Sequence, residues 1–208
     1  MRRGGWKALR IVRLFLLAAF CLVHCPGALS PALSQAAKPK SGSAKKQQAS
    51  LTPQVRYGTE GLPAPVQEMR EAILTAVRAG RIEELRHAWE LNELKPDLGA
   101  NVGSDPIAHW KQISGDGEGR EILAAIGELL DAGYVTLPLG PDIENNGLYV
   151  WPYFAEMPID KLTPPQEVEL LRLVPPAAVR AMRAAGRYTY WRLAIGADGT
   201  WHSFRRDP

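Results

Sequence analysis

The chain has 208 residues, of which 46% are hydrophobic, and its formal net charge is +3. This length favours one domain with appendages, because single domains typically run to about 100–150 residues. The positive charge does not belong to that domain, since from Gly61 onward the sequence carries 15 basic and 21 acidic side chains. Contacts to nucleic-acid phosphates need clustered lysine and arginine, so this balance argues against nucleic-acid binding.

The first 34 residues have the pattern of a cleavable secretory signal. They contain five basic residues and no acidic one. An apolar run over residues 11–23 follows the basic start, and it is shorter than the roughly 20 residues that a membrane-spanning helix needs. The small residues Ala32 and Ser34 fit a cleavage site after Ser34. We therefore predict a signal peptide over residues 1–34 and a periplasmic or secreted bacterial protein without stable membrane insertion after cleavage; an uncleaved anchor is the alternative.

Both cysteines of the chain, Cys21 and Cys25, lie in this leader. Lipid-modified cysteines usually follow a small residue, whereas these two follow Phe20 and His24, which argues against a lipoprotein. Once the leader is removed, the chain has no thiol. This excludes disulfides, thiolate metal sites and a cysteine nucleophile, so the folded part has to be stabilised by its own core.

Residues 35–60 predict a disordered linker, because they are rich in Ala, Lys, Ser, Gln and Pro and lack a periodic apolar pattern. The lysines of this segment can contact an anionic envelope polymer, or they serve only to keep the linker solvated. The remaining residues, 61–208, predict a single α+β domain.

The first half of this domain predicts helices. Val66, Met69 and Ile73 recur at helical spacing and predict a helix from Pro65 to Gly80. A second short helix follows over residues 82–89, then a loop over 94–105 and a helical turn over 107–113. A strongly amphipathic segment near residues 120–132 predicts another helix, which Gly133 would end as a left-handed cap.

The second half predicts a mixture of strands and helices. Two strands are expected over residues 134–137 and 148–154, and Pro152 makes the second an edge strand or the site of a bulge. Thr163 begins a helix with a capping-box pattern, and Pro175 separates it from a further helix that ends at Gly186. A hairpin over 187–195 and 200–206 closes the chain. The fold class is therefore α+β, with N-terminal helices packed on a small antiparallel sheet and a closing β-hairpin.

Aromatic residues alternate along the second predicted strand and so share one of its faces. Rings with polar tips offer flat apolar area to a peptide, a glycan or a protein partner. The alternative interpretation is that they are half-buried core and cross-strand pairs. We predict a ligand-binding surface formed by Tyr149, Trp151, Tyr153, Glu156, Arg192 and Trp201.

A second hypothesis is a periplasmic hydrolase. His109 lies between Asp105 and Ser114 in the sequence, and a serine, a histidine and an acid can form a catalytic triad when they converge in space. The glycine-rich loop over residues 114–119 has the alternative role of a turn whose acids cap the next helix. The histidines form no pair at metal-binding spacing, and we predict no metal and no cofactor.

Three motifs stand out in the second half of the domain: residues 149–156 (YVWPYFAE), 162–164 (LTP) and 195–201 (IGADGTW). With them the chain resembles conserved hypothetical exported proteins of Gram-negative bacteria. The resemblance covers most of residues 65–204 and implies export without a particular activity. The order of elements is also distantly similar to NTF2-like domains, from which the helices expected between Glu156 and Arg187 depart. Together these features favour a non-catalytic envelope protein that binds an envelope polymer or a protein.

Overall fold

The computed structural model describes residues 53–100, 102–140 and 146–206. Its helices are α1 (Ala64–Ala79), α2 (Leu85–Glu90), α3 (Pro106–Ile113), α4 (Arg120–Asp131), α5 (Pro164–Leu173) and α6 (Pro176–Ala185). Its strands are β1 (Val135–Pro138), β2 (Gly147–Trp151), β3 (Trp191–Gly196) and β4 (Trp201–Arg206). Short 3₁₀ turns, η1 (Ile82–Glu84), η2 (Tyr153–Glu156) and η3 (Ile159–Lys161), lie between them. The predicted α+β class, with helices that precede the sheet and a closing hairpin, is confirmed.

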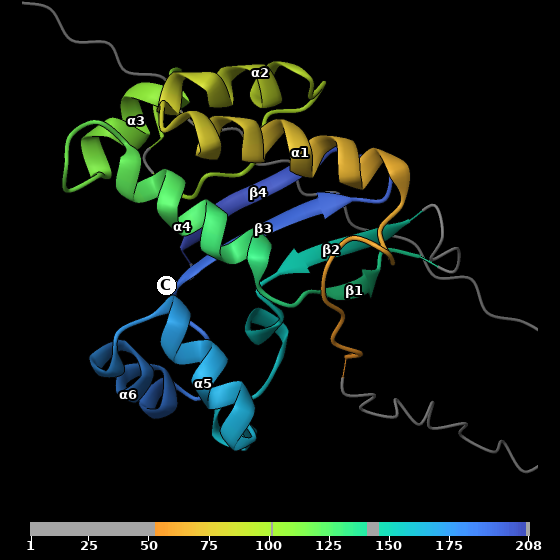
Figure 1. The fold of residues 1–208 in the computed structure, drawn as a ribbon, viewed down its shortest axis with the longest axis vertical. Helices are drawn as coiled ribbons and strands as arrows, with labels where there is room; N and C mark the ends of the chain where they lie inside the picture. The colour runs from red at the N-terminus through yellow and green to blue at the C-terminus, as the bar shows by residue number, and fades with distance from the viewer. Residues whose placement is uncertain (1–52, 101, 141–145, 207–208) are drawn as a thin grey trace, which may run out of the picture. The chain divides into compact units, whose positions relative to one another are not determined.

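The four strands form one antiparallel sheet in the order β1-β2-β3-β4 (Figure 1). β1 pairs with β2, and β3 pairs with β4 in the closing hairpin. The central pair joins β2 to β3, with Leu148 opposite Gly196 and Trp151 opposite Leu193. The chain between these two strands forms α5 and α6, so the middle of the sheet depends on residues that lie far apart in the sequence.

The four N-terminal helices cover one face of the sheet and enclose the first hydrophobic core. Val66, Met69 and Ile73 of α1 are buried there, as their helical spacing predicts. α1 ends at Gly80, which has the positive φ of a left-handed cap. Leu193 and Ile195 of β3 point into this core.

The opposite face of the sheet packs against a second core, to which α5 and α6 contribute. Val150 and Ala194 point from the sheet toward Leu170 of α5 and Met182 of α6. α5 begins at the predicted capping box, in which the Thr163 N–H donates to the Gln166 side chain at 2.9 Å. Both faces of β2 and β3 are therefore buried.

The predicted linker extends too far, because its last residues belong to the folded domain. Arg56 and Tyr134 exchange two backbone hydrogen bonds of 2.8 and 2.9 Å at the start of β1. Val55 packs against the second core. The earlier part of the predicted linker and the predicted signal peptide lie outside the described residues.

Gly133 does not act as the predicted left-handed cap. Helix α4 ends at Asp131, its C-cap Ala132 has an extended backbone with a φ of −73°, and the positive-φ glycines do not include Gly133. The buried Gly133 instead allows close packing, since a Cβ there would lie 2.8–3.0 Å from side-chain atoms of Tyr57, Tyr153 and Val55.

Two further predictions about the strands are wrong. β2 ends at Trp151, so the cis-linked Pro152 lies beyond the strand and makes neither an edge nor a bulge. β3 begins at Trp191 instead of Arg187, because Tyr188 leaves the sheet direction to fill the second core.

Across the described residues, none of the helices has both the length and the apolar character required to cross a bilayer.

Candidate functional site

The predicted aromatic surface lies inside the molecule. Tyr149 and Trp151 share one face of β2, as their alternation predicts, but that face points into the first core with Trp201. Tyr153 follows the end of β2 and turns into the second core. The four side chains are between 0% and 6% exposed. Helices cover both faces of this sheet, so these rings offer no surface to a ligand and the prediction is corrected.

The two charged residues of that predicted surface contact each other. The Arg192 guanidinium donates to a Glu156 carboxylate oxygen at 2.9 Å, and both side chains are largely buried. This ion pair joins the start of β3 to the end of η2. Because the two charges are paired and shielded from solvent, we assign them a structural role.

The residues of the hydrolase hypothesis do not converge. Asp105 caps the N-terminus of α3, where its carboxylate accepts from the Ile107 N–H at 3.0 Å and from Arg86 at 3.2 Å. Ser114 lies past the other end of this eight-residue helix, nine residues from Asp105 and about 13.5 Å away along the axis. Its hydroxyl donates to Asp116. His109 bonds to Asp105 only through its backbone N–H, at 3.2 Å, and its imidazole forms no hydrogen bond to the Asp105 carboxylate or the Ser114 hydroxyl, so the geometry contradicts this triad.

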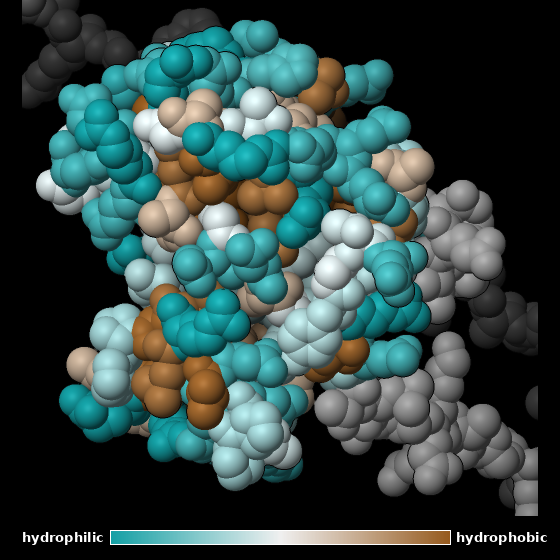
Figure 2. Space-filling view, in the orientation of Figure 1, coloured by the Kyte–Doolittle hydropathy of each residue, from teal (hydrophilic) through white to brown (hydrophobic). Residues whose placement is uncertain are grey.

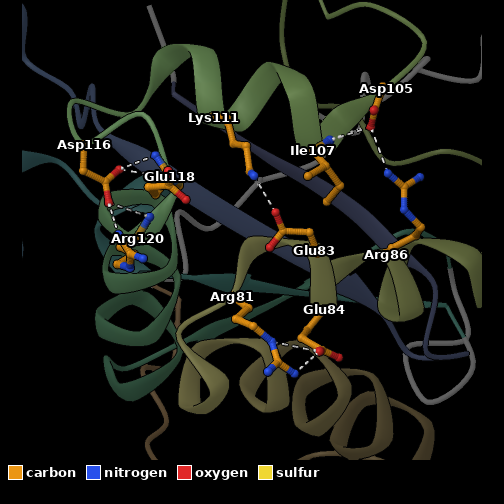
Figure 3. A network of polar contacts seen from close by, with 11 residues as sticks. Arg81, Glu83, Glu84, Arg86, Asp105, Ile107, Lys111, Asp116, Glu118 and Arg120 are labelled. Carbon is orange, nitrogen blue, oxygen red and sulfur yellow. Dashed lines mark hydrogen bonds and ion pairs between the residues drawn. The ribbon is translucent and has the colours of Figure 1, made fainter.

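The glycine-rich loop serves to begin α4. The Asp116 carboxylate accepts from the N–H groups of Glu118, Gly119 and Arg120 at 3.0–3.2 Å (Figure 3). These bonds satisfy amides at the helix start, where a negative charge is favourable. The hydrogen bond from the Ser114 hydroxyl, followed by these amides, lowers the pKa of Asp116 below its usual value. The loop is therefore a cap, in agreement with its alternative interpretation.

A metal centre finds no support in the part of the chain that the structure describes. His87 on α2 and His202 on β4 are exposed and belong to different elements. Within residues 53–100, 102–140 and 146–206, no three histidine, cysteine or carboxylate side chains are placed to hold an ion.

An open groove runs between α4 and α5. Two adjoining hollows of about 170 and 200 Å³ form it, and they share Glu128 and Leu173. α4 supplies a stripe of small and acidic side chains, Tyr57 lines the first hollow, and Tyr190 and Trp191 line the second. We call this the α4–α5 groove, and its lining residues are Tyr57, Glu121, Ala124, Ala125, Glu128, Leu129, Asp131, Ala132, Glu169, Arg172, Leu173, Tyr190 and Trp191.

Two tyrosines hold one carboxylate of the groove in place. The Tyr57 hydroxyl lies 3.1 and 3.0 Å from the two Glu169 carboxylate oxygens, and the buried Tyr153 hydroxyl donates to Glu169 at 3.1 Å. Burial, together with the neighbouring Tyr57 and Glu169, raises the pKa of Tyr153 far above its usual value. Partial burial and the Glu169 carboxylate also raise the pKa of Tyr57. Both phenols therefore stay protonated as donors, and their hydrogen bonds fix the Glu169 side chain at the wall of the groove.

The other charges of the groove are less constrained. The Glu128 side chain is exposed and makes no hydrogen bond or ion pair within the described residues. Asp131 lies 3.8 Å from the Arg70 guanidinium, a loose contact. The lining contains four carboxylates, with Arg172 as the one guanidinium among the described lining residues. The field in the groove is consequently negative.

None of the groove residues was predicted as a site. Tyr57 was assigned to the linker, and Glu128 and Glu169 lie on separate helices whose packing no local pattern reveals. The sequence contained one signal for the groove. Ala124 and Ala125 lie beside Glu128 on the polar side of α4, where a solvent-facing helix surface usually has larger charged or polar side chains.

Searches of family models, curated proteins and solved structures found no match to this chain. The resemblance to exported proteins of Gram-negative bacteria stays a prediction.

Proposed function

We propose that this protein is an exported, non-catalytic domain that binds a cationic peptide segment of a partner protein in the α4–α5 groove. The observation that carries the proposal is the groove's composition: an open channel with alanines on one wall, carboxylates on both walls and aromatic side chains in both hollows. The proposed binding surface is the α4–α5 groove instead of the aromatic strand. The predicted class of function, binding without catalysis, is unchanged.

The dimensions of the groove favour a peptide. The lining stripe of α4 extends from Glu121 to Ala132, about 16 Å at 1.5 Å per residue. Small side chains such as Ala124 allow the backbone or a side-chain stem of a peptide to approach the helix closely. The length of this stripe and the carboxylates on both walls therefore fit a protein segment better than a neutral glycan.

The charges of the groove favour lysine or arginine in that segment. The Glu128 side chain has no partner among the described residues, and Glu169 is held by Tyr57 and Tyr153, so a cation gains two carboxylates without displacing a partner that the structure describes. The rings of Tyr190 and Trp191 already have a cation of this chain as their partner, since the Arg206 guanidinium lies 5.1 and 4.7 Å from their centres, so the preference for a basic segment comes from the carboxylates. Charged contacts in a partly enclosed groove supply specificity and faster association more than raw affinity.

Selection of binders from a random phage-displayed peptide library tests the proposal. We expect the recovered peptides to be enriched in lysine and arginine, and their affinity, measured by fluorescence polarisation, to fall as salt rises. Glu128→Lys should weaken binding about tenfold or more. The matched control Glu90→Lys makes the same charge change at an exposed site on α2 and should bind like wild type. Peptides without basic enrichment, or equal binding by both variants, would refute the groove.

N-terminal sequencing of the native protein tests the export part of the proposal. We expect the chain to begin at Gln35, the residue after the predicted cleavage site. A cytosolic protein that retains Met1 would contradict it, and this outcome is independent of the groove.

A further inference from the structure

Hydroxyl groups without an acceptor gather at the outer edge of the sheet. Tyr134, just before β1, and Thr136 on β1 point to the same face, and their buried hydroxyls have no acceptor among the described residues. Tyr149 of β2 lies opposite Thr136 and points to this face as well. Its hydroxyl makes no hydrogen bond within the part of the chain that the structure describes. Buried polar groups normally have a partner, so this edge lacks a group that accepts these protons.

Arg56 adds a positive charge beside these hydroxyls. Its backbone is held against Tyr134 by the two hydrogen bonds at the start of β1, and Figure 1 shows this segment, in orange, beside the strand. Burial raises the pKa of the Tyr134 phenol, and the nearby guanidinium partly offsets the rise. Within residues 53–100, 102–140 and 146–206 this guanidinium has no carboxylate partner. A guanidinium only donates hydrogen bonds, so it does not supply the missing acceptor.

Gly61 leaves space between these donors. A Cβ at this residue would lie 2.9 Å from the Tyr134 hydroxyl oxygen, and 3.5 and 3.6 Å from the Cδ and Nη1 atoms of Arg56. Gly61 is not among the positive-φ glycines, so its backbone conformation does not require a glycine. Gly61 and Arg56 are both exposed, so solvent reaches the space from their side. The guanidinium and the phenol therefore border a recess that a side chain on residue 61 would fill.

Donors that lack an acceptor fit an anionic oxygen group. A carboxylate accepts two parallel hydrogen bonds from a guanidinium and has further lone pairs for hydroxyl donors. A single guanidinium among neutral hydroxyls matches one negative charge, and the excess of acidic residues from Gly61 onward disfavours a doubly charged phosphate. Around β1, on the right of the view, Figure 2 shows mainly hydrophilic residues, which suit a polar ligand better than an apolar one.

We propose that the carboxylate group of a small ligand binds at this edge, between Arg56 and the hydroxyls of Tyr134 and Tyr149. The bound carboxylate would pair with the guanidinium and accept the phenol protons that have no acceptor in the folded chain. The inference goes beyond the proposed function, because the α4–α5 groove selects cations. Tyr57 of that groove packs against Tyr153 of the second core, whereas Tyr134 and Tyr149 belong to the first core.

An NMR titration of the isotope-labelled protein with sodium acetate, at constant ionic strength, tests the proposal. We expect saturable shifts of the Arg56 and Tyr134 backbone amides with a Kd of about 1–10 mM, as for a weak site. Inorganic phosphate should bind more weakly. Arg56→Gln should lose the saturable shift, whereas the matched control Arg187→Gln removes an equal charge at an exposed residue after α6 and should bind acetate like wild type.

A pair of tyrosine variants separates binding from a structural role. Tyr134→Phe removes a hydroxyl without an acceptor, so it should be at least as stable as wild type in urea, yet bind acetate about tenfold more weakly. Tyr188→Phe is the control, because the buried Tyr188 hydroxyl donates to the Trp191 carbonyl at 2.9 Å. This variant should lose stability and bind acetate like wild type.

Four results would overturn the carboxylate site. They are a wild type without a saturable acetate shift, equal acetate binding by Arg56→Gln, unchanged acetate binding by Tyr134→Phe, and a Tyr134→Phe protein as destabilised as Tyr188→Phe. Tighter binding of phosphate than of acetate would overturn the choice of a carboxylate.

Discussion

Replacing Gly133 with alanine probes the contact between the N-terminal segment and the rest of the domain. The added Cβ would lie 2.8 Å from a Tyr57 ring carbon, 2.9 Å from a Tyr153 ring carbon and 3.0 Å from a Val55 methyl. Tyr153 has little freedom to move, because its ring is buried and its hydroxyl is bonded to Glu169. The exposed Tyr57 can swing outward, so we expect the strain to displace residues 55–57 and to break the bond from Tyr57 to Glu169.

The expected cost follows from the tightness of these contacts. Adding a methyl group to a well-packed site typically destabilises a protein by about 1–3 kcal/mol, and the three contacts place Gly133→Ala in this range. Urea denaturation followed by circular dichroism measures the change in the free energy of unfolding. The phenol pKa of Tyr57 should also fall toward its usual value, which absorbance in alkaline solution detects.

A glycine in open space supplies the control for this experiment. Gly103 has an ordinary φ and nothing within 4 Å of the position that a Cβ would take. Gly103→Ala should therefore stay within about 0.5 kcal/mol of wild type or be slightly more stable. A Gly133→Ala protein as stable as Gly103→Ala, with an unchanged Tyr57 titration, would show that the described packing at Gly133 is wrong.

Three further predictions follow from buried rings and shifted pKa values. Trp151→Ala should cost about 3–5 kcal/mol in urea denaturation, because the ring is 1% exposed, whereas Leu94→Ala should change stability by less than about 0.5 kcal/mol; similar costs for both would place Trp151 outside the core. The raised pKa of Tyr153 favours its protonated form in the folded state, so stability should be complete below about pH 10 and fall as the pH rises further, and Tyr153→Phe should flatten this alkaline loss. The lowered pKa of Asp116 has the opposite effect on stability. The ionised Asp116 stabilises the folded state at neutral pH, and this stabilisation is lost as the pH falls below about 4. The urea midpoint of Asp116→Asn should therefore change less with acid pH than that of wild type.

Local patterns predicted the elements of this fold well. The buried spacing of α1, its end at Gly80 and the capping box at Thr163 each depend on residues within one or two helical turns. The shared face of Tyr149 and Trp151 also follows from alternation alone. What alternation did not reveal is that this face is covered.

The coverage of the sheet depends on contacts between distant segments. Val150 alternates with the rings of β2 and is also buried, which is typical of a strand with helices on both faces. The groove has the same origin, since Tyr57, Glu128 and Glu169 come from three separate segments of the chain. Gly133 shows a further limit: a glycine after a helix predicts a left-handed cap, and only the packed structure reveals that its small size is what matters.

The insertion of α5 and α6 between the two central strands has a consequence for how the chain folds. The β1–β2 and β3–β4 hairpins close over short distances in sequence, whereas the β2–β3 pair has to close a loop that contains both helices. Closing long loops costs chain entropy before any contact compensates for it, and such non-local pairing slows folding. Joining the two hairpins is therefore expected to be the late event, and until it occurs the inner edges of β2 and β3 are open to pairing with other chains.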